Sequence, residues 1–430
     1  MTGIDSSIVE RADGASANIL LVAARNITGQ RNGRIAVLET AVQALTAEGH
    51  RVTILALTSE PGPEHWLGCP VRRVAPPAPG ALAANAVRAL LGGSSLNESI
   101  FDAKPIHGEV RSAVSDSAAQ IVIADGIRIW PLVQDLGLPT IMHLDDLLSE
   151  RYRDPKFMAG NESVLGYFST QLPLFLVPTA ERMAKLLLGF EARRLARREV
   201  FVAQQAHFTA LTSRAEAEIL AARSGQAVKG IPMAVDPREP ADPAEAGAGT
   251  AVFLGALYYG PNMAALRFLR DEVLPLLRER GLALQLDVIG AATPAQAAEF
   301  ADCPEITVLG YQDELTTALQ GHRMFLSPVT VGTGVKTKVL DGMSVGLPVV
   351  ATGLGVAGIP VVEGQHALVA EHAEGLAEHI EILIRQPETA AALGAAGRAL
   401  LAETMSVRVV QEAWRQALES VSPSLQGAVK

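Results

Sequence analysis

The residues best placed to do chemistry cluster between positions 322 and 352. This stretch holds a glycine-rich turn, a valine and two lysines: Gly332, Thr333, Gly334, Val335, Lys336 and Lys338. Short apolar runs flank it, and apolar residues recur at helical spacing after the turn, which predicts strand, turn, helix and strand in that order. A helix that begins right after the glycines points free backbone N–H groups and its positive dipole end into the turn. We therefore predict a phosphate site, where an anion offsets the two lysine charges in the first helical turn.

Asp341 follows on the same predicted helix. It lies seven residues after Gly334, so the two positions share nearly the same helix face, about 10 Å apart along the axis. A carboxylate at this distance from a phosphate can accept hydrogen bonds from the hydroxyls of a ribose. A solvated carboxylate on an amphipathic helix is the alternative, and helix periodicity alone leaves both open.

Three familiar motifs overlap this stretch, and either their residue order or the predicted elements beside them argue against each. The turn differs from a P-loop because a valine separates its last glycine from the lysine. Residues 342–346 match the nucleophile elbow of serine hydrolases, but the predicted order of strand and helix is reversed, which makes Ser344 a weak nucleophile candidate. Residues 353–358 match a dinucleotide fingerprint, yet Ile-Pro-Val-Val follows and predicts no helix.

A second group of polar residues lies around a predicted strand at 139–144. His143 is on this strand, and Asp145 and Asp146 follow it. Open α/β sheets bind ligands at the carboxyl ends of their strands, where both aspartates are expected. Asp145 is two residues from His143, so both should face the same side, where a carboxylate can bind or deprotonate a substrate hydroxyl. For Asp146 we favour a cap on the helix that follows.

Composition excludes several classes of protein. The chain has 430 residues and a net charge of −10, with a pI near 5.5, which argues against a nucleic-acid surface. The two cysteines, Cys69 and Cys303, have no ligand-like spacing, so no zinc site or disulfide framework is predicted. No apolar run is long enough for a transmembrane helix, and the N-terminus does not resemble a signal peptide. We expect a soluble cytoplasmic protein without a bound metal.

The order of predicted elements indicates an α/β protein with parallel sheets. Strand, helix and strand within the first 57 residues form a βαβ unit, whose first connection contains Gly29 and Gly33. We expect a flexible leader at 1–16, a first domain at 17–230 and a linker at 231–250. A second domain at 251–402 and a C-terminal segment at 403–430 complete the expected organisation.

Several of these motifs together resemble a known family. The run from Lys338 to Thr352, KVLDGMSVGLPVVAT, is similar to the donor-binding motif of the family-4 retaining glycosyltransferases of the GT-B type. IPMAVD at 231–236 resembles their interdomain linker, and Gly255 to Asn262 resembles the opening of their second domain. The resemblance extends over most of residues 18–418. It implies two Rossmann-like domains that face a central cleft, and a helix in the C-terminal segment 403–430 that returns to the first domain.

The resemblance also implies an activity and a set of site residues. It implies transfer of a sugar from a UDP- or GDP-linked donor to a glycan or lipid-linked acceptor, with retention and with no cofactor. The implied catalytic residues are Asp145, His143 and Lys336; the implied donor-binding residues are Gly332, Thr333, Gly334, Val335, Lys338, Asp341, Tyr258 and Asn262; Gly29 and Gly33 are implied at the cleft. Thr333 stands where the family has the first carboxylate of a conserved pair, and Asp145 stands where most members have histidine.

Other interpretations stay open. A sugar-nucleotide epimerase has the same architecture, and a non-catalytic nucleotide-binding or scaffold protein would also fit the two replaced residues. Residues 191–200, EARRLARREV, predict an arginine-rich helix. We favour a solvated face stabilised by Glu191 and Glu199, with contact to an anionic membrane or a lipid phosphate as the alternative.

Overall fold

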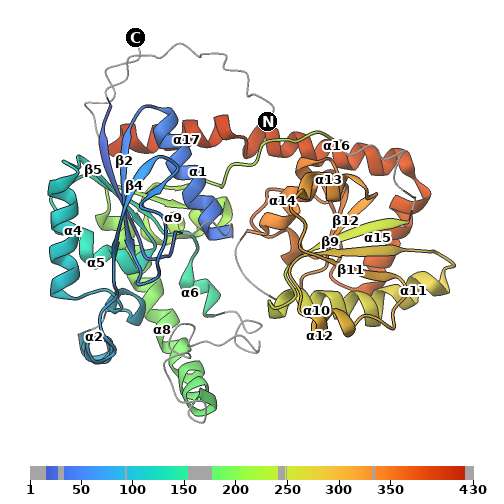
Figure 1. Ribbon diagram of the computed structural model, residues 1–430, viewed down its shortest axis with the longest axis horizontal. Helices are drawn as coiled ribbons and strands as arrows, with labels where there is room; N and C mark the ends of the chain where they lie inside the picture. Colours follow the sequence, from blue (N-terminus) through green and yellow to red (C-terminus); the bar gives the residue numbers. More distant parts are fainter. Residues whose placement is uncertain are drawn as a thin grey trace.

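The computed structural model describes residues 16–27, 33–92, 94–153, 177–240, 247, 249–331 and 335–421. For residues 33, 90 and 177–187 it describes the main chain and not the side chains. Two parallel sheets lie side by side, each covered by helices on both faces (Figure 1). Residues 1–15 of the predicted leader at 1–16, Gly29 and the turn Gly332, Thr333 and Gly334 lie outside the described residues.

The first sheet has eight strands in the order β3-β4-β2-β1-β5-β6-β7-β8, and all its pairs except β3–β4 are parallel. The strands are β1 Asn18–Ala23, β2 Arg51–Leu57, β3 His65–Trp66, β4 Cys69–Val74, β5 Ile121–Asp125, β6 Thr140–His143, β7 Phe208–Leu211 and β8 Val228–Gly230. The helices of this part are α1 Gly33–Ala47, α2 Pro79–Gly92, α3 Leu96–Ser99, α4 Lys104–Asp116, η1 Ile127–Ile129, α5 Trp130–Val133, α6 Leu148–Arg151, α8 Val177–Gln205 and α9 Arg214–Ser224.

Both faces of this sheet are buried, which explains why its central strands are continuous apolar runs. Strand β1 directs Leu20 and Val22 into one apolar layer, with α4, α5, α8 and α9. It directs Ile19 and Leu21 into the opposite layer, with α1 and with α17 Val407–Val421. Helix α17 therefore packs beside α1 on the first sheet, although it is the last helix described (Figure 1).

The second sheet has six parallel strands in the order β11-β10-β9-β12-β13-β14. They are β9 Thr250–Leu254, β10 Gln285–Ile289, β11 Ile306–Gly310, β12 Met324–Ser327, β13 Val349–Ala351 and β14 Leu368–Val369. Its helices are α10 Gly260–Phe268, η3 Leu269–Val273, α11 Leu274–Glu279, α12 Pro294–Ala298, α13 Leu315–Gln320, α14 Thr337–Ser344, η4 Leu354–Val356, α15 Ala373–Arg385 and α16 Pro387–Thr404. Helices α10, α11 and α15 cover one face, and α13, α14 and α16 cover the other.

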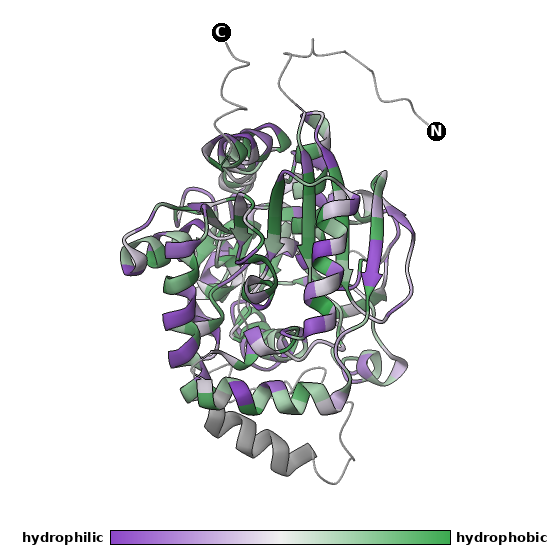
Figure 2. Ribbon diagram, turned by 90° about the vertical axis from the view of Figure 1, so that its left-hand side faces the viewer, coloured by the Kyte–Doolittle hydropathy of each residue, from purple (hydrophilic) through white to green (hydrophobic). Residues whose placement is uncertain are grey.

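Strand order reverses once within each sheet, between β1 and β5 in the first and between β9 and β12 in the second. At such a point the connections that leave the two strands go to opposite faces, which opens a crevice at their carboxyl ends. Figure 2 shows hydrophobic strands at the centre of the molecule and helices whose outer faces are hydrophilic. Within the described part of the chain, no helix combines the length and apolar character that crossing a bilayer requires.

Candidate functional site

A large cleft runs between the two sheets. Its volume is about 1300 Å³, and both parts of the chain line it. Residues from α1, α9 and the end of β6 form one wall, and the ends of β9 and β12 with the start of α14 form the other. Across the described ranges, no group of three or more His, Cys, Asp or Glu side chains is arranged to hold a metal ion.

The start of α14 lies at the crevice of the second sheet. The helix begins at Thr337 and not at Val335, so the prediction that it starts right after the glycines is wrong by two residues. Val335 and Lys336 form a turn instead: the Thr337 N–H donates to the Val335 carbonyl at 3.0 Å, and Lys336 is the non-helical cap residue. Val335 packs on Gly358, where an ideal Cβ would come within 2.8 Å of it, and this contact holds the turn in place.

Val335, Lys336 and Lys338 all line the cleft. Lys338 is in the first turn of α14, as predicted, whereas Lys336 precedes that turn. Burial lowers the pKa of the Lys338 ammonium group to about 8, and the nearby charge of Asp341 counteracts only part of this effect. A half-buried lysine of this kind is stabilised by an anionic ligand.

Asp341 also lines the cleft, one helical turn beyond Lys338. Its Oδ1 accepts a hydrogen bond from Arg238 Nη2 at 3.0 Å. The pair is partly exposed, so the carboxylate is neither fully solvated nor fully buried. Sequence patterns did not indicate Arg238, because it comes from the linker, about 100 residues before its partner.

The two predicted residues near β9 differ in their environments. Tyr258 lines the cleft with 73% of its surface exposed. Asn262 is buried, and its Nδ2 donates to the Ala256 carbonyl at 2.8 Å, which fixes the turn between β9 and α10. Gly255 faces this amide so closely that a Cβ there would lie 2.7 Å from Asn262 Cγ. Asn262 therefore shapes the cleft wall.

On the opposite wall, β6 ends at His143 and not at Leu144. Asp145 adopts a left-handed backbone conformation with φ of 69°, so the predicted common strand face of His143 and Asp145 is wrong. His143 is only 2% exposed and lines neither of the cavities described here. Its Nδ1 lies 3.6 Å from Asp125 Oδ1, and its ring lies 6.0 Å from that of Trp414 on α17. This environment gives His143 a supporting position behind the cleft.

Asp145 lies at the cleft between two arginines. Its carboxylate is 3.3 Å from Arg25 Nη2 and 3.5 Å from Arg34 Nε. Thr212 fixes it further: its hydroxyl donates to Asp145 Oδ1 at 3.3 Å, and its backbone N–H donates to the Asp145 carbonyl at 3.0 Å. These contacts hold the left-handed turn and orient the carboxylate.

Asp146 does not cap the following helix, contrary to prediction. Helix α6 has Leu147 as its cap residue and no side-chain cap, and Asp146 instead forms an ion pair with Arg151. Burial raises the pKa of the Asp146 carboxyl group. The pKa of Glu216 on α9 is raised to about 7. Burial is the larger cause, and the negative charge of Asp146 is the second. All these side chains line the cleft, and sequence patterns gave no indication of Glu216.

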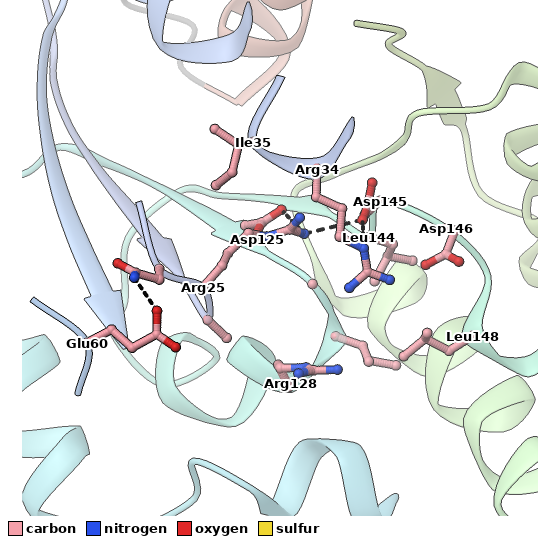
Figure 3. A pocket seen from close by; sticks show the side chains of 14 residues that line it. Arg25, Arg34, Ile35, Glu60, Asp125, Arg128, Leu144, Asp145, Asp146 and Leu148 are labelled. Atoms are coloured by element: carbon pink, nitrogen blue, oxygen red, sulfur yellow. Dashed lines mark hydrogen bonds and ion pairs between the residues drawn. The ribbon is translucent and has the colours of Figure 1, made fainter. Parts of the chain in front are cut away.

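A smaller cavity of about 280 Å³ lies where β1, β5 and β6 end (Figure 3). Arg34, Asp145 and Asp146 are shared with the large cleft, and the small cavity is lined by two more arginines, Arg25 and Arg128. Arg25 forms a two-pronged ion pair with Asp125 at the end of β5 and continues to Asp145. Arg25, Arg34 and Arg128 were not predicted, although each lies within two residues of the end of a strand or the start of a helix at this edge of the sheet. Gly33, predicted at the cleft, is the first residue of α1.

The arginine-rich segment of α8 is more than a solvated face. Glu191 is buried and accepts from the backbone and side chain of Asn97. Glu199 is also buried and accepts from Ser149, while Arg198 forms a two-pronged pair with Glu98. The segment therefore joins α8 to α3 and α6.

Ser344 is fully buried, and its hydroxyl donates to the Asp341 carbonyl at 2.7 Å within α14. A serine hydrolase that uses Ser344 is thereby contradicted. The 353–358 segment contains only the short helix η4, which agrees with the rejection of a dinucleotide fingerprint.

Comparison with known proteins identifies the second half of the chain. Residues 248–386 match the family model described as glycosyl transferases group 1. This part of the chain, about a third of its length, is similar to the glycosyl transferases of group 1. The predicted family resemblance and the predicted enzyme class, a glycosyltransferase, are thus confirmed at this level. No curated protein sequence matches the chain.

Solved structures share the fold over nearly the whole chain. Anabaena Alr3699/HepE in complex with UDP and glucose has 12% identity and a TM-score of 0.62, and the match covers 94% of this chain and 100% of that one. Sucrose-phosphate synthase from Thermosynechococcus elongatus has 15% identity and a TM-score of 0.65, over 93% and 98%. The lipopolysaccharide outer core galactosyltransferase WaaB has 12% identity and a TM-score of 0.57, over 94% and 99%. At such identities the likeness shows the fold alone. It confirms the predicted GT-B class of two Rossmann-like domains.

Proposed function

We propose that the chain transfers a sugar from a nucleotide-diphosphate sugar to an acceptor hydroxyl, with retention of the anomeric configuration. One observation carries the proposal: Lys336, Lys338 and the first turn of α14 converge on the crevice at which β9 and β12 part. Two ammonium groups and the positive end of a helix dipole at a strand-order reversal are suited to a diphosphate.

In the transfer, the bond between the anomeric carbon and the diphosphate oxygen breaks, and its electron pair stays on the diphosphate. The acceptor oxygen bonds to the same carbon and releases its proton. Charge therefore develops on the leaving diphosphate, where Lys336, Lys338 and the α14 terminus stabilise it. Because these groups supply positive charge, we propose a reaction without a metal or other cofactor.

We propose UDP or GDP as the nucleotide of the donor. Asp341 lies about 6 Å along the helix from the start of α14, within reach of ribose hydroxyls if the phosphates bind at that start. Tyr258 and Tyr311, both exposed and both lining the cleft, offer flat faces for the base. The structural neighbour HepE was solved with UDP, which supports a donor of this class.

We propose that Asp145 orients the acceptor hydroxyl, because it faces the cleft on the wall opposite to the lysines. The acceptor in this proposal is a glycan or a lipid-linked glycan in polysaccharide or glycolipid biosynthesis. WaaB, a neighbour of the same fold, is named for lipopolysaccharide synthesis. Arg193 and Arg197 on α8 are exposed and provide a cationic face for peripheral contact with the cytoplasmic side of an anionic membrane.

Calorimetric titration with UDP, GDP and ADP tests the donor assignment. We expect one nucleotide to bind the wild type and to bind Asp341→Ala at least tenfold more weakly. Asp271→Asn is the matched control, because Asp271 is exposed on the same domain and does not line the cleft. Binding of none of the three nucleotides would contradict the proposal. Release of an isomerised sugar nucleotide without an acceptor would instead identify an epimerase.

A further inference from the structure

The small cavity lies at the point of the first sheet that is best suited to a ligand. It is bounded by the ends of β1 and β5, where strand order reverses, and by the turn after β6. Its volume of about 280 Å³ is at the lower end for ligand sites, and Ile35, Leu144 and Leu148 supply apolar surface among the charges. Its contact with Asp145 joins it to the large cleft.

The carboxylates of this cavity already have partners. Asp125 is paired with Arg25, which also contacts Asp145, and Asp146 is paired with Arg151. Glu60, at the exposed rim, accepts a hydrogen bond from the Asn26 side chain. Three of the four carboxylates of the cavity are therefore engaged by guanidinium groups other than that of Arg128, and Glu60 forms no ion pair with Arg128 within the described residues.

Arg128 also lines this cavity. It is half-buried, and the hydrogen bond that its side chain makes within the described residues goes to the neutral amide oxygen of Asn97, at 3.2 Å. Burial lowers the pKa of Arg128, and the positive charges of Arg34 and Arg25 lower it further. Figure 3 shows Arg128 and Arg34 at the same hollow, reached from η1 and α1 respectively.

Two further observations point to a negative ligand. Arg34 is 50% exposed, its nearest carboxylate atom is 3.5 Å away, and it belongs to the first turn of α1, which has no acidic residue. The positive end of this helix dipole adds to the local potential. Arg25 Nη1 is buried and has no hydrogen-bond partner among the described residues.

We propose that this cavity binds an oxyanion, a phosphate or a carboxylate, on the acceptor, with Arg34 and Arg128 as its ligands. The guanidinium fork matches both groups geometrically, and arginine is the residue that commonly binds them. The inference deepens the proposed function and rests on it: the anion anchors the acceptor, while Asp145 at the junction with the cleft faces its hydroxyl. The acceptor class is thereby narrowed to acidic or phosphorylated glycans.

The test titrates inorganic phosphate and acetate into the full chain at constant ionic strength. The nucleotide that binds in the donor test is present at saturation, so that its site is already filled. We expect binding of at least one oxyanion, weakened about tenfold or more in Arg34→Gln and in Arg128→Gln. Arg111→Gln, an exposed arginine of α4 that lines neither cavity, should bind like the wild type. Preference for phosphate or for acetate identifies the source of the anion.

Equal binding by the wild type and both cavity variants, or no oxyanion binding while a nucleotide binds, would overturn the inference and leave the proposed function standing. A third outcome is possible: the chain binds no nucleotide but still binds an oxyanion through Arg34 and Arg128. This result would overturn the acceptor assignment together with the proposed function. Melting temperatures monitor folding. Arg34→Gln keeps the test decisive if Arg128→Gln unfolds, because Arg34 is half exposed.

Discussion

Binding of a nucleotide diphosphate to the cleft is expected to draw a proton onto Lys338 at alkaline pH. Burial holds the pKa of this ammonium group at about 8, against an ordinary value of 10.5. A diphosphate beside it favours the charged form and returns the pKa towards 10.5. If the return is complete, binding takes up about 0.1 proton at pH 7, about 0.5 at pH 8 and about 0.9 at pH 9.

The uptake is measured by calorimetry in buffers that differ in ionisation enthalpy, since the slope of observed against buffer enthalpy gives the number of protons. Lys338→Met, which cannot titrate, should show a slope near zero at pH 9, and any residual slope there measures the other groups. Nucleotide binding to the wild type with no proton uptake at pH 8 and 9 would refute the reasoning. An equal slope in Lys338→Met would assign the proton to another residue.

Three further predictions use other parts of the structure. Lys336→Ala should lower turnover at least tenfold, measured as nucleotide release, with an unchanged melting temperature; wild-type rates would contradict its role beside the phosphates. The pKa of Glu216 in the folded state is about 7, above its ordinary value of 4.5. The contribution of Glu216 to the free energy of unfolding therefore falls as the pH rises from 4.5 to 7. Glu216→Gln should therefore increase the free energy of unfolding in urea by about 1–3 kcal/mol at pH 8 and leave it unchanged at pH 4. Gly342→Ala should destabilise by about 1–3 kcal/mol, because its Cβ would lie 2.5 Å from the Phe325 ring, whereas Gly321→Ala meets no atom within 4 Å and should have little effect.

The fold was largely predictable because both sheets are buried on both faces. Strands such as β1 and β5 are uninterrupted apolar runs, and the βαβ order fixes their parallel direction. Prediction failed where burial is incomplete: β4, with two arginines, and β8, only three residues long, were not identified. The start of α14 was also misplaced, because the contact of Val335 with Gly358 joins residues that local patterns treat separately.

The charged residues of the candidate site were harder to predict than its backbone. Lys338 and Asp341 share a helix that follows the glycine-rich turn, and the spacing of Asp341 from Gly334 indicated that the turn and the carboxylate act together. The pairs Arg25–Asp125 and Arg238–Asp341 span about 100 residues each, and only the tertiary fold brings them into contact. His143 shows the opposite case: strand periodicity placed it beside Asp145, but the left-handed turn at Asp145 separates the two side chains.

The linker contacts indicate where the angle between the two domains can change. The chain passes between the domains twice, once after β8 and once between α16 and α17. Ala234 is tied to the first domain by a hydrogen bond to Thr40, and Arg238 is tied to the second, since its backbone N–H donates to the Ser344 carbonyl. The two passages are joined to each other, because Val235 donates to the Met405 carbonyl at 2.8 Å. A change in domain angle must therefore be absorbed within residues 234–238 and 405–407. Arg238 donates to α14 through both its backbone and its side chain, so it moves with the second domain and keeps its contact with the proposed ribose ligand Asp341 when the domain angle changes.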